Sequence, residues 1–224
     1  MKTFSKLTGL LLLGLAPLLA PAASFEGRFN VRLQDDDGTR AVSCAMKAEH
    51  LRAEIPSDNG AKIVSLVDFG RKEISAILPG QPLYAVMSLD DAVAKLGDVR
   101  KGQGALQKTT ETAVVLGYAC VKYVAKSKEG VTEIWTAAAL GSPLAGSAFQ
   151  SLAHTPAERE LLAQGGFPLR VIGRTPDGTA HFRMEVVSME KQPLPDSFFA
   201  PPAGYQKIDV GILLRGGLNL FGGR

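Results

Sequence analysis

Few residues of this chain have the types and spacing that catalysis requires. Ser188 and Lys191 have the spacing of a serine nucleophile and a lysine base, but they end a predicted strand, whereas that pair normally needs the first turn of a helix. His181, Arg183 and Glu185 occupy alternate positions, which predicts a surface histidine on the polar side of a strand. The pattern favours a protein that is not an enzyme. The alternative is a hydrolase built on Ser188 and Lys191 or on His181.

The sequence also lacks a motif for a cofactor or a metal ion. Gly102-Gln103-Gly104 misses the third glycine of a dinucleotide-binding loop and follows no clear strand. The histidines His50, His154 and His181 are not at ligand spacing from the two cysteines. We therefore expect no cofactor and no metal site.

The two cysteines, Cys44 and Cys120, are candidates for a disulfide. An even number of cysteines in an exported protein favours a bridge. Closing this loop would constrain the unfolded chain by roughly 4 to 5 kcal/mol. The alternative is two separate thiols, because the sequence does not give the distance between the two Cα atoms.

Residues 1–22 are predicted to be a secretory signal peptide. Lys2 and Lys6 precede the apolar run 10–19, and Ala20-Pro21-Ala22 supplies the small residues of a cleavage site. The run contains Pro17 and is too short to span a membrane. No cysteine stands at the cleavage point to accept a lipid. We expect a periplasmic protein without a lipid anchor or a transmembrane span.

The charge balance argues against one class of partner. The chain has 25 basic and 22 acidic residues, and loss of the leader with its two lysines leaves 23 basic against 22 acidic. A protein so close to neutral has no electrostatic reason to bind nucleic acid or an anionic membrane surface.

Alternation of apolar and polar residues predicts a meander of antiparallel strands. In the first strand Phe25, Phe29 and Leu33 face one side, and Asp37-Gly38 then signals a hairpin turn. Further strands are predicted at 42–46, 50–55, 63–69, 73–78, 109–116, 118–125, 131–137, 167–174 and 181–186, with one more short strand at 84–87.

Three segments carry helix signals. Ser88 and Asp91 resemble a capping box, and residues 143–152 are small and apolar. Thr155-Pro156-Ala157-Glu158 is a strong helix start, with Leu161 and Leu162 on the buried side.

These elements together predict one α+β domain over residues 23–209. Its centre is a single curved antiparallel sheet, or half-open barrel, of about nine or ten strands covered by two or three short helices. Residues 210–224 form a glycine-rich apolar tail, which we expect to be poorly ordered or to lie on an apolar surface.

A sheet with one apolar face must be covered, and short helices fill a curved sheet loosely. A gap beneath them would suit an acyl chain. The predicted lining consists of Phe29, Val31, Ile63, Val67, Trp135, Phe182 and Met184. The alternative is that these side chains simply form a packed core.

Two stretches resemble a known family. They are Gly117-Tyr118-Ala119-Cys120 with the downstream Glu133-Ile134-Trp135, and the ending Pro201-Pro202-Ala203-Gly204-Tyr205. This resembles an uncharacterised family of bacterial periplasmic proteins, which is similar to the outer-membrane lipoprotein carriers (LolA/LolB-like). The resemblance covers most of residues 25–209. It implies a sheet wrapped around apolar side chains, a lid of helices, and a lipid chain as the ligand.

Two functions follow from these observations. The first is a periplasmic protein that binds a lipid-like or other apolar ligand in the concave face of its sheet. The second is an envelope protein with a filled core, which binds a protein partner through a sheet edge or through the tail at 210–224.

Overall fold

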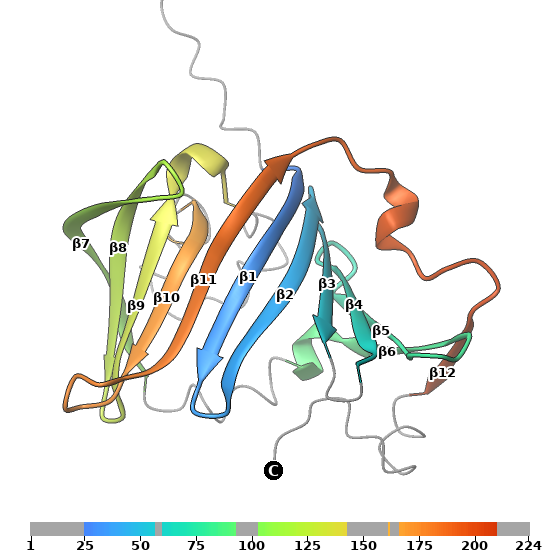
Figure 1. The fold of residues 1–224 in the computed structure, drawn as a ribbon, viewed down its shortest axis with the longest axis horizontal. Coiled ribbons are helices and arrows are strands. Elements are labelled where there is room, and N and C mark those ends of the chain that lie inside the picture. Colours follow the sequence, from blue (N-terminus) through green and yellow to red (C-terminus); the bar gives the residue numbers. More distant parts are fainter. Residues whose placement is uncertain (1–24, 57–59, 93–102, 143–160, 162–165, 210–224) are drawn as a thin grey trace, which may run out of the picture.

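The computed structural model describes residues 25–56, 60–92, 103–142, 161 and 166–209. They build one sheet of twelve strands (Figure 1). The strands are β1 Gly27–Asp35, β2 Gly38–Lys47, β3 His50–Pro56, β4 Lys62–Asp68, β5 Glu73–Ile77, β6 Leu83–Ser88, β7 Gln103–Val115, β8 Tyr118–Ser127, β9 Gly130–Ala137, β10 Phe167–Arg174, β11 Ala180–Lys191 and β12 Gln206–Asp209.

The strand order across the sheet is β12-β6-β5-β4-β3-β2-β1-β11-β10-β9-β8-β7. Every neighbouring pair is antiparallel except β12 and β6, which run parallel. The sheet curves without closing, because its end strands β7 and β12 do not pair with each other in the described part of the chain (Figure 1). The predicted open, curved sheet is confirmed, but the predicted nine or ten strands are too few.

The described residues contain less helix than predicted. Their helical positions are 89–92 and 161, together with two 3-10 helices, η1 Ala138–Leu140 and η2 Asp196–Phe199. The first predicted helix does begin after Ser88, whose Oγ accepts a hydrogen bond of 3.1 Å from the backbone N–H of Asp90. The remaining predicted helix positions, including 143–152 and 155–160, lie outside the described residues, as do the leader and the tail at 210–224.

Strand register assigns every side chain to one of two faces, because directly paired residues project from the same side of a sheet. Val31 pairs with Val42 and Val186, and we call their side the apolar face. Arg32 pairs with Glu185, and we call their side the charged face. Neighbouring residues of a strand alternate, so these assignments fix the rest of β1 and β2. In β11 a bulge opposite Asn30 and Val31 interrupts the alternation, so the faces of its residues beyond Val186 follow from their partners on β1.

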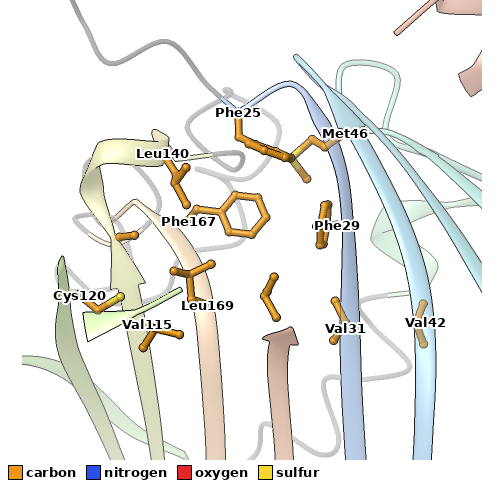
Figure 2. Packing of buried hydrophobic residues seen from close by; sticks show 12 residues of the cluster. Phe25, Phe29, Val31, Val42, Met46, Val115, Cys120, Leu140, Phe167 and Leu169 are labelled. Atoms are coloured by element: carbon orange, nitrogen blue, oxygen red, sulfur yellow. The ribbon is translucent and has the colours of Figure 1, made fainter. Parts of the chain in front are cut away.

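The main core lies on the central strands and includes an aromatic cluster (Figure 2). Phe25, Phe29 and Phe167 meet edge to face, with ring centroids 5.2 to 6.0 Å apart. Such pairs contribute about 0.5–1.5 kcal/mol each beyond the area that they bury. The buried cluster comprises Phe25, Phe29, Val31, Val42, Met46, Val115, Cys120, Ala137, Leu140, Phe167, Leu169 and Val186.

Gly130 is required where the β8–β9 turn meets β10. Its φ is +137°, and a Cβ atom there would overlap the backbone carbonyl of Arg174. We predict that Gly130→Ala lowers the free energy of unfolding by about 3 kcal/mol or more, because both backbone strain and a backbone clash are added. Urea denaturation measures this change.

Gly38 provides the matched control for this variant. Its φ is +126°, but nothing lies within 4 Å of the position that a Cβ atom would take. Gly38→Ala should therefore cost only the strain, about 1 kcal/mol. Equal losses in the two variants would contradict the packing that we describe at Gly130.

Candidate functional site

Six of the seven predicted lining residues lie on the apolar face. Phe29 and Val31 are buried in the core cluster, and Met184 packs against it. Phe182 and Met184 alternate along β11, in phase with Val186. Ile63 and Val67 of β4 lie on the same face but are only partly buried. The structure therefore brings Phe29, Val31 and Met184 together around one core, with β4 further along the sheet.

Trp135, the seventh residue, lies on the opposite face. It pairs with Lys122 on β8 and with Arg170 on β10, and the Nζ atom of Lys122 lies 5.5 Å from the centre of its ring. Its buried Nε1–H has no hydrogen-bond partner among the described residues. It still contacts the core cluster, which continues on this side through Cys120 and Ala137. Trp135 thus packs against the same cluster as Phe29, Val31 and Met184 but does not share a face with them.

The apolar face is covered unevenly. Over β1, β2, β10 and β11 most of its side chains are buried, whereas over β3 to β6 most are half-buried. Ile55 is 38% exposed although it pairs with Ile63 on this face. We call the half-buried group the open patch. It consists of Leu51, Ile55, Ile63, Val67, Ile74 and Met87.

Only Ile63 and Val67 of this patch were expected as lining. The others could have been found by extending the same alternation, because Leu51 pairs with Val67, Val67 with Ile74, and Ile74 with Met87. The open patch thus spans four strands, with Ser65 and its partners Ala53 and Ala76 on the same face between its two ends.

The charged face is covered by ion pairs between neighbouring strands. Arg170 Nε donates to Glu185 Oε1 at 2.9 Å, and Arg174 Nε donates to Glu133 Oε1 at 3.1 Å. Lys122 lies 3.8 Å from Glu133 and is only 14% exposed. Each such pair adds little stability, but a row of them makes this face suited to water.

A C-terminal segment, residues 192–205, crosses the charged face from the end of β11 to β12 at the sheet edge (Figure 1). We call it the strap. The ring of Phe198 in the strap lies between the guanidinium groups of Arg28 and Arg52, each 4.5 Å from its centroid. Arg52 Nη1 also donates to the carbonyl oxygen of Phe198 at 3.2 Å. Phe198 therefore anchors the strap to β1 and β3.

Polar contacts hold the beginning of the strap. Lys47 Nζ donates to the carbonyl oxygen of Leu194 at 2.7 Å and lies 2.8 Å from the carboxylate of Asp196. The hydrogen bond between Lys47 and Asp196 lowers the pKa of the Asp196 carboxyl group. The backbone N–H of Leu194 donates to Glu26 Oε1 at 2.8 Å. Strands β1 and β2 thus fix the path of the strap toward β12.

Three cavities lined by described residues lie on the charged face. One of about 370 Å³ is bounded by β1, β2 and β11, and one of about 160 Å³ lies beside Phe198. A third, of about 590 Å³, lies between β5, β6, β12 and the strap. Their linings are mostly polar side chains, which differ from the lipid-type lining predicted for the other face.

The suspected catalytic pair is not assembled. Ser188 pairs with Asn30 on the charged face and accepts a hydrogen bond of 2.8 Å from Asn30 Nδ2. Lys191 pairs with Gly27, which places it on the apolar face. His181 is exposed, as predicted, and His154 lies outside the described residues.

Two further searches of the described residues gave negative results. No group of three or more His, Cys, Asp or Glu side chains is arranged to hold a metal ion in the described part of the chain. Within the same residues, no helix has the length and apolar character needed to cross a membrane.

The predicted disulfide is wrong. Cys44 on β2 and Cys120 on β8 are both free thiols. Four strands, β1, β11, β10 and β9, separate β2 from β8, so the cysteines are roughly 24 Å apart along the sheet. A bridge needs Cα atoms within about 7 Å. Burial raises the pKa of Cys44 to about 12 and also raises that of Cys120.

Comparison with protein families gives one match, which covers most of the chain. Residues 25–205 match the model of a domain of unknown function, DUF4412. The chain belongs to the DUF4412 family. The prediction of an uncharacterised family is confirmed. A search of curated proteins found no match for this DUF4412 protein.

Three solved structures match the DUF4412 chain at low sequence identity. An uncharacterised conserved protein from Thermus thermophilus matches with a TM-score of 0.54 and 12% identity, over 84% of this chain and 92% of its own. PNGF-II matches with a TM-score of 0.51 and 15% identity, over 86% of this chain and 33% of its own. The Mycobacterium tuberculosis lipoprotein LppX matches with a TM-score of 0.37 and 10% identity, over 76% and 89%. The first two matches show a shared fold and nothing more, and no conclusion is drawn from the third.

The free thiols of the DUF4412 protein can be counted directly. We predict two reactive thiols per chain in denaturant without reductant, and almost none in the native protein at pH 8, because Cys44 stays protonated well above that pH and Cys120 is fully buried. Colorimetric thiol titration measures both counts. Finding no reactive thiol in the unreduced, denatured chain would show that Cys44 and Cys120 are bridged after all.

The raised pKa of Cys44 predicts how stability changes at alkaline pH. Because the folded chain keeps the Cys44 proton up to about 12 whereas the unfolded chain loses it near its ordinary value, stability falls as pH rises above that ordinary value. Cys44→Ala should remove this part of the alkaline loss in pH-dependent denaturation. An unchanged slope would contradict the buried thiol.

Proposed function

We propose that this DUF4412 protein is a non-catalytic binding protein of the cell envelope, which holds a lipid-like ligand against the apolar face of its sheet. The observation that supports this most is the open patch, which continues the face of the packed core but leaves six apolar side chains only half-buried. The predicted signal peptide supports the envelope location.

The chemistry of the open patch favours an acyl chain over a polar ligand. Its members are aliphatic residues and a methionine, and methionine adapts its shape to flexible apolar partners. Completing the burial of six half-exposed side chains would contribute about 1 kcal/mol each. Burial of the apolar surface of the acyl chain itself adds to this sum, and the costs of association are subtracted from it.

An edge strand favours a second candidate, binding of a protein partner. In the described sheet β7 is a terminal strand with β8 as its only neighbour. Val114 near its end is 73% exposed, and Leu116 in the following turn is 42% exposed. An extended peptide could add to this edge, although bulges in β7 interrupt its first part.

Adjacent residues on β4 give a matched test of the lipid proposal. We predict that Ile63→Asn weakens binding of a fluorescent fatty acid at least about tenfold, because a polar amide would lie in the open patch. Lys62→Asn places the same side chain one residue away on the charged face, and should change the affinity less than twofold. Fluorescence titration of both variants measures this, with thermal unfolding to confirm that each is folded.

The outcomes separate the two candidates. Equal affinities in the two variants would show that the ligand does not bind at the apolar face. An absence of saturable binding by the unaltered protein would contradict the lipid proposal. A partner bound at the β7 edge should be indifferent to both substitutions, since β4 and β7 lie far apart in the strand order.

A further inference from the structure

We propose that the 370 Å³ cavity on the charged face binds a small zwitterionic group, with its anionic part at Arg28 and its ammonium part at Glu190. The cavity is lined on this face by Arg28, Asn30, Ser43, Ser188 and Glu190. It lies on the side of the sheet opposite the open patch, so this site does not depend on the proposed lipid function.

Arg28 on β1 and Glu190 on β11 lie opposite each other in the sheet but form no ion pair with each other. They are directly paired in register, yet neither side chain makes an ion pair or a hydrogen bond among the described residues. Other opposite charges of this face do pair, as Arg170 and Glu185 do at 2.9 Å. A cation and an anion are thus both available at the rim of one cavity.

Phe198 fixes the position of Arg28. The guanidinium of Arg28 lies 4.5 Å from the ring centroid, and that of Arg52 lies at the same distance from it. The two arginines differ in their hydrogen bonds, because Arg52 donates to Glu54 Oε1 at 3.1 Å and to the carbonyl of Phe198. A stacked guanidinium with free donors loses little side-chain entropy when it binds an anion.

Hydroxyl groups complete the anion side of the cavity. Ser43 and Arg28 both line the 370 Å³ cavity and the 160 Å³ cavity. The Oγ atom of Ser188 accepts a hydrogen bond from Asn30 at 2.8 Å, so its own proton is available to a ligand oxygen. Carboxylate and phosphate oxygens accept hydrogen bonds from guanidinium and hydroxyl donors of this kind.

The charge of the lining selects the class of ligand. A plain anion would be attracted by Arg28 and repelled by Glu190, and a plain cation would meet the reverse. A compact zwitterion satisfies both groups, and the cavity volume falls within the range of small-molecule sites. The ethanolamine phosphate of a lipid head group and a free α-amino acid share this chemistry.

An NMR titration of the full mature chain tests the site. The probes are glycerophosphoethanolamine, alanine, inorganic phosphate and ethanolamine. We expect saturable shifts of the backbone amides of β1, β2 and β11 with glycerophosphoethanolamine or alanine, and at least fivefold weaker binding of phosphate and of ethanolamine. The zwitterion that binds more tightly shows whether the natural ligand is a lipid head group or a free amino acid. No saturable shift with either zwitterion in the millimolar range, or phosphate bound as tightly, would overturn the proposal.

Variants separate the two charges. Arg28→Gln should weaken zwitterion binding at least tenfold, whereas Arg32→Gln, on the same strand and face but outside the cavity, should change it less than twofold. Glu190→Gln should weaken zwitterion binding and strengthen phosphate binding. Because Glu190 is exposed, this variant should fold even if Arg28→Gln does not. An unchanged preference for the zwitterion in Glu190→Gln would overturn the assignment.

Discussion

The structure depends on keeping one face of an unclosed sheet away from water. A closed barrel would bury its inner face all round, but here the described strands end at β7 and β12. Burial on the central strands is achieved by the edge-to-face contacts of Phe25, Phe29 and Phe167 and by the side chains that surround them. Over β3 to β6 most side chains of the same face are half-buried, and this asymmetry is the physical basis of the proposed binding surface.

The opposite face is organised by the strap. Its aromatic anchor, Phe198, lies between two arginines from different strands, and its continuation β12 extends the sheet beside β6. The strap therefore ties the centre of the sheet to its far edge and buries Ala45 on the charged face beneath Leu194 and Phe199. It also holds Arg28 beside a polar cavity. The contact between Phe198 and Arg28 therefore holds the strap and also positions a residue of the proposed zwitterion site.

Much of the sheet was predictable because alternation has a period of two, and most of the strands carry it in the sequence. The twelfth, Gln206–Asp209, is short and parallel to its partner, so it has no such pattern. The face on which Trp135 lies was not predictable, because alternation alone does not say which of the two sets of side chains faces the core. Its pairing with Lys122 and Arg170 on the neighbouring strands places it on the charged face. The disulfide was wrong because distance across a sheet depends on strand order, which the cysteine count does not contain.

Native mass spectrometry of the protein, purified gently from its own cell envelope, tests the central claim most directly. The account predicts a population that carries the added mass of an acyl-chain compound, which organic extraction removes. It also predicts that the half-buried side chains over β3 to β6 become protected when that compound is returned. Protein that is always free of added mass, with no protection of these strands by any lipid, would contradict a binding role for the apolar face.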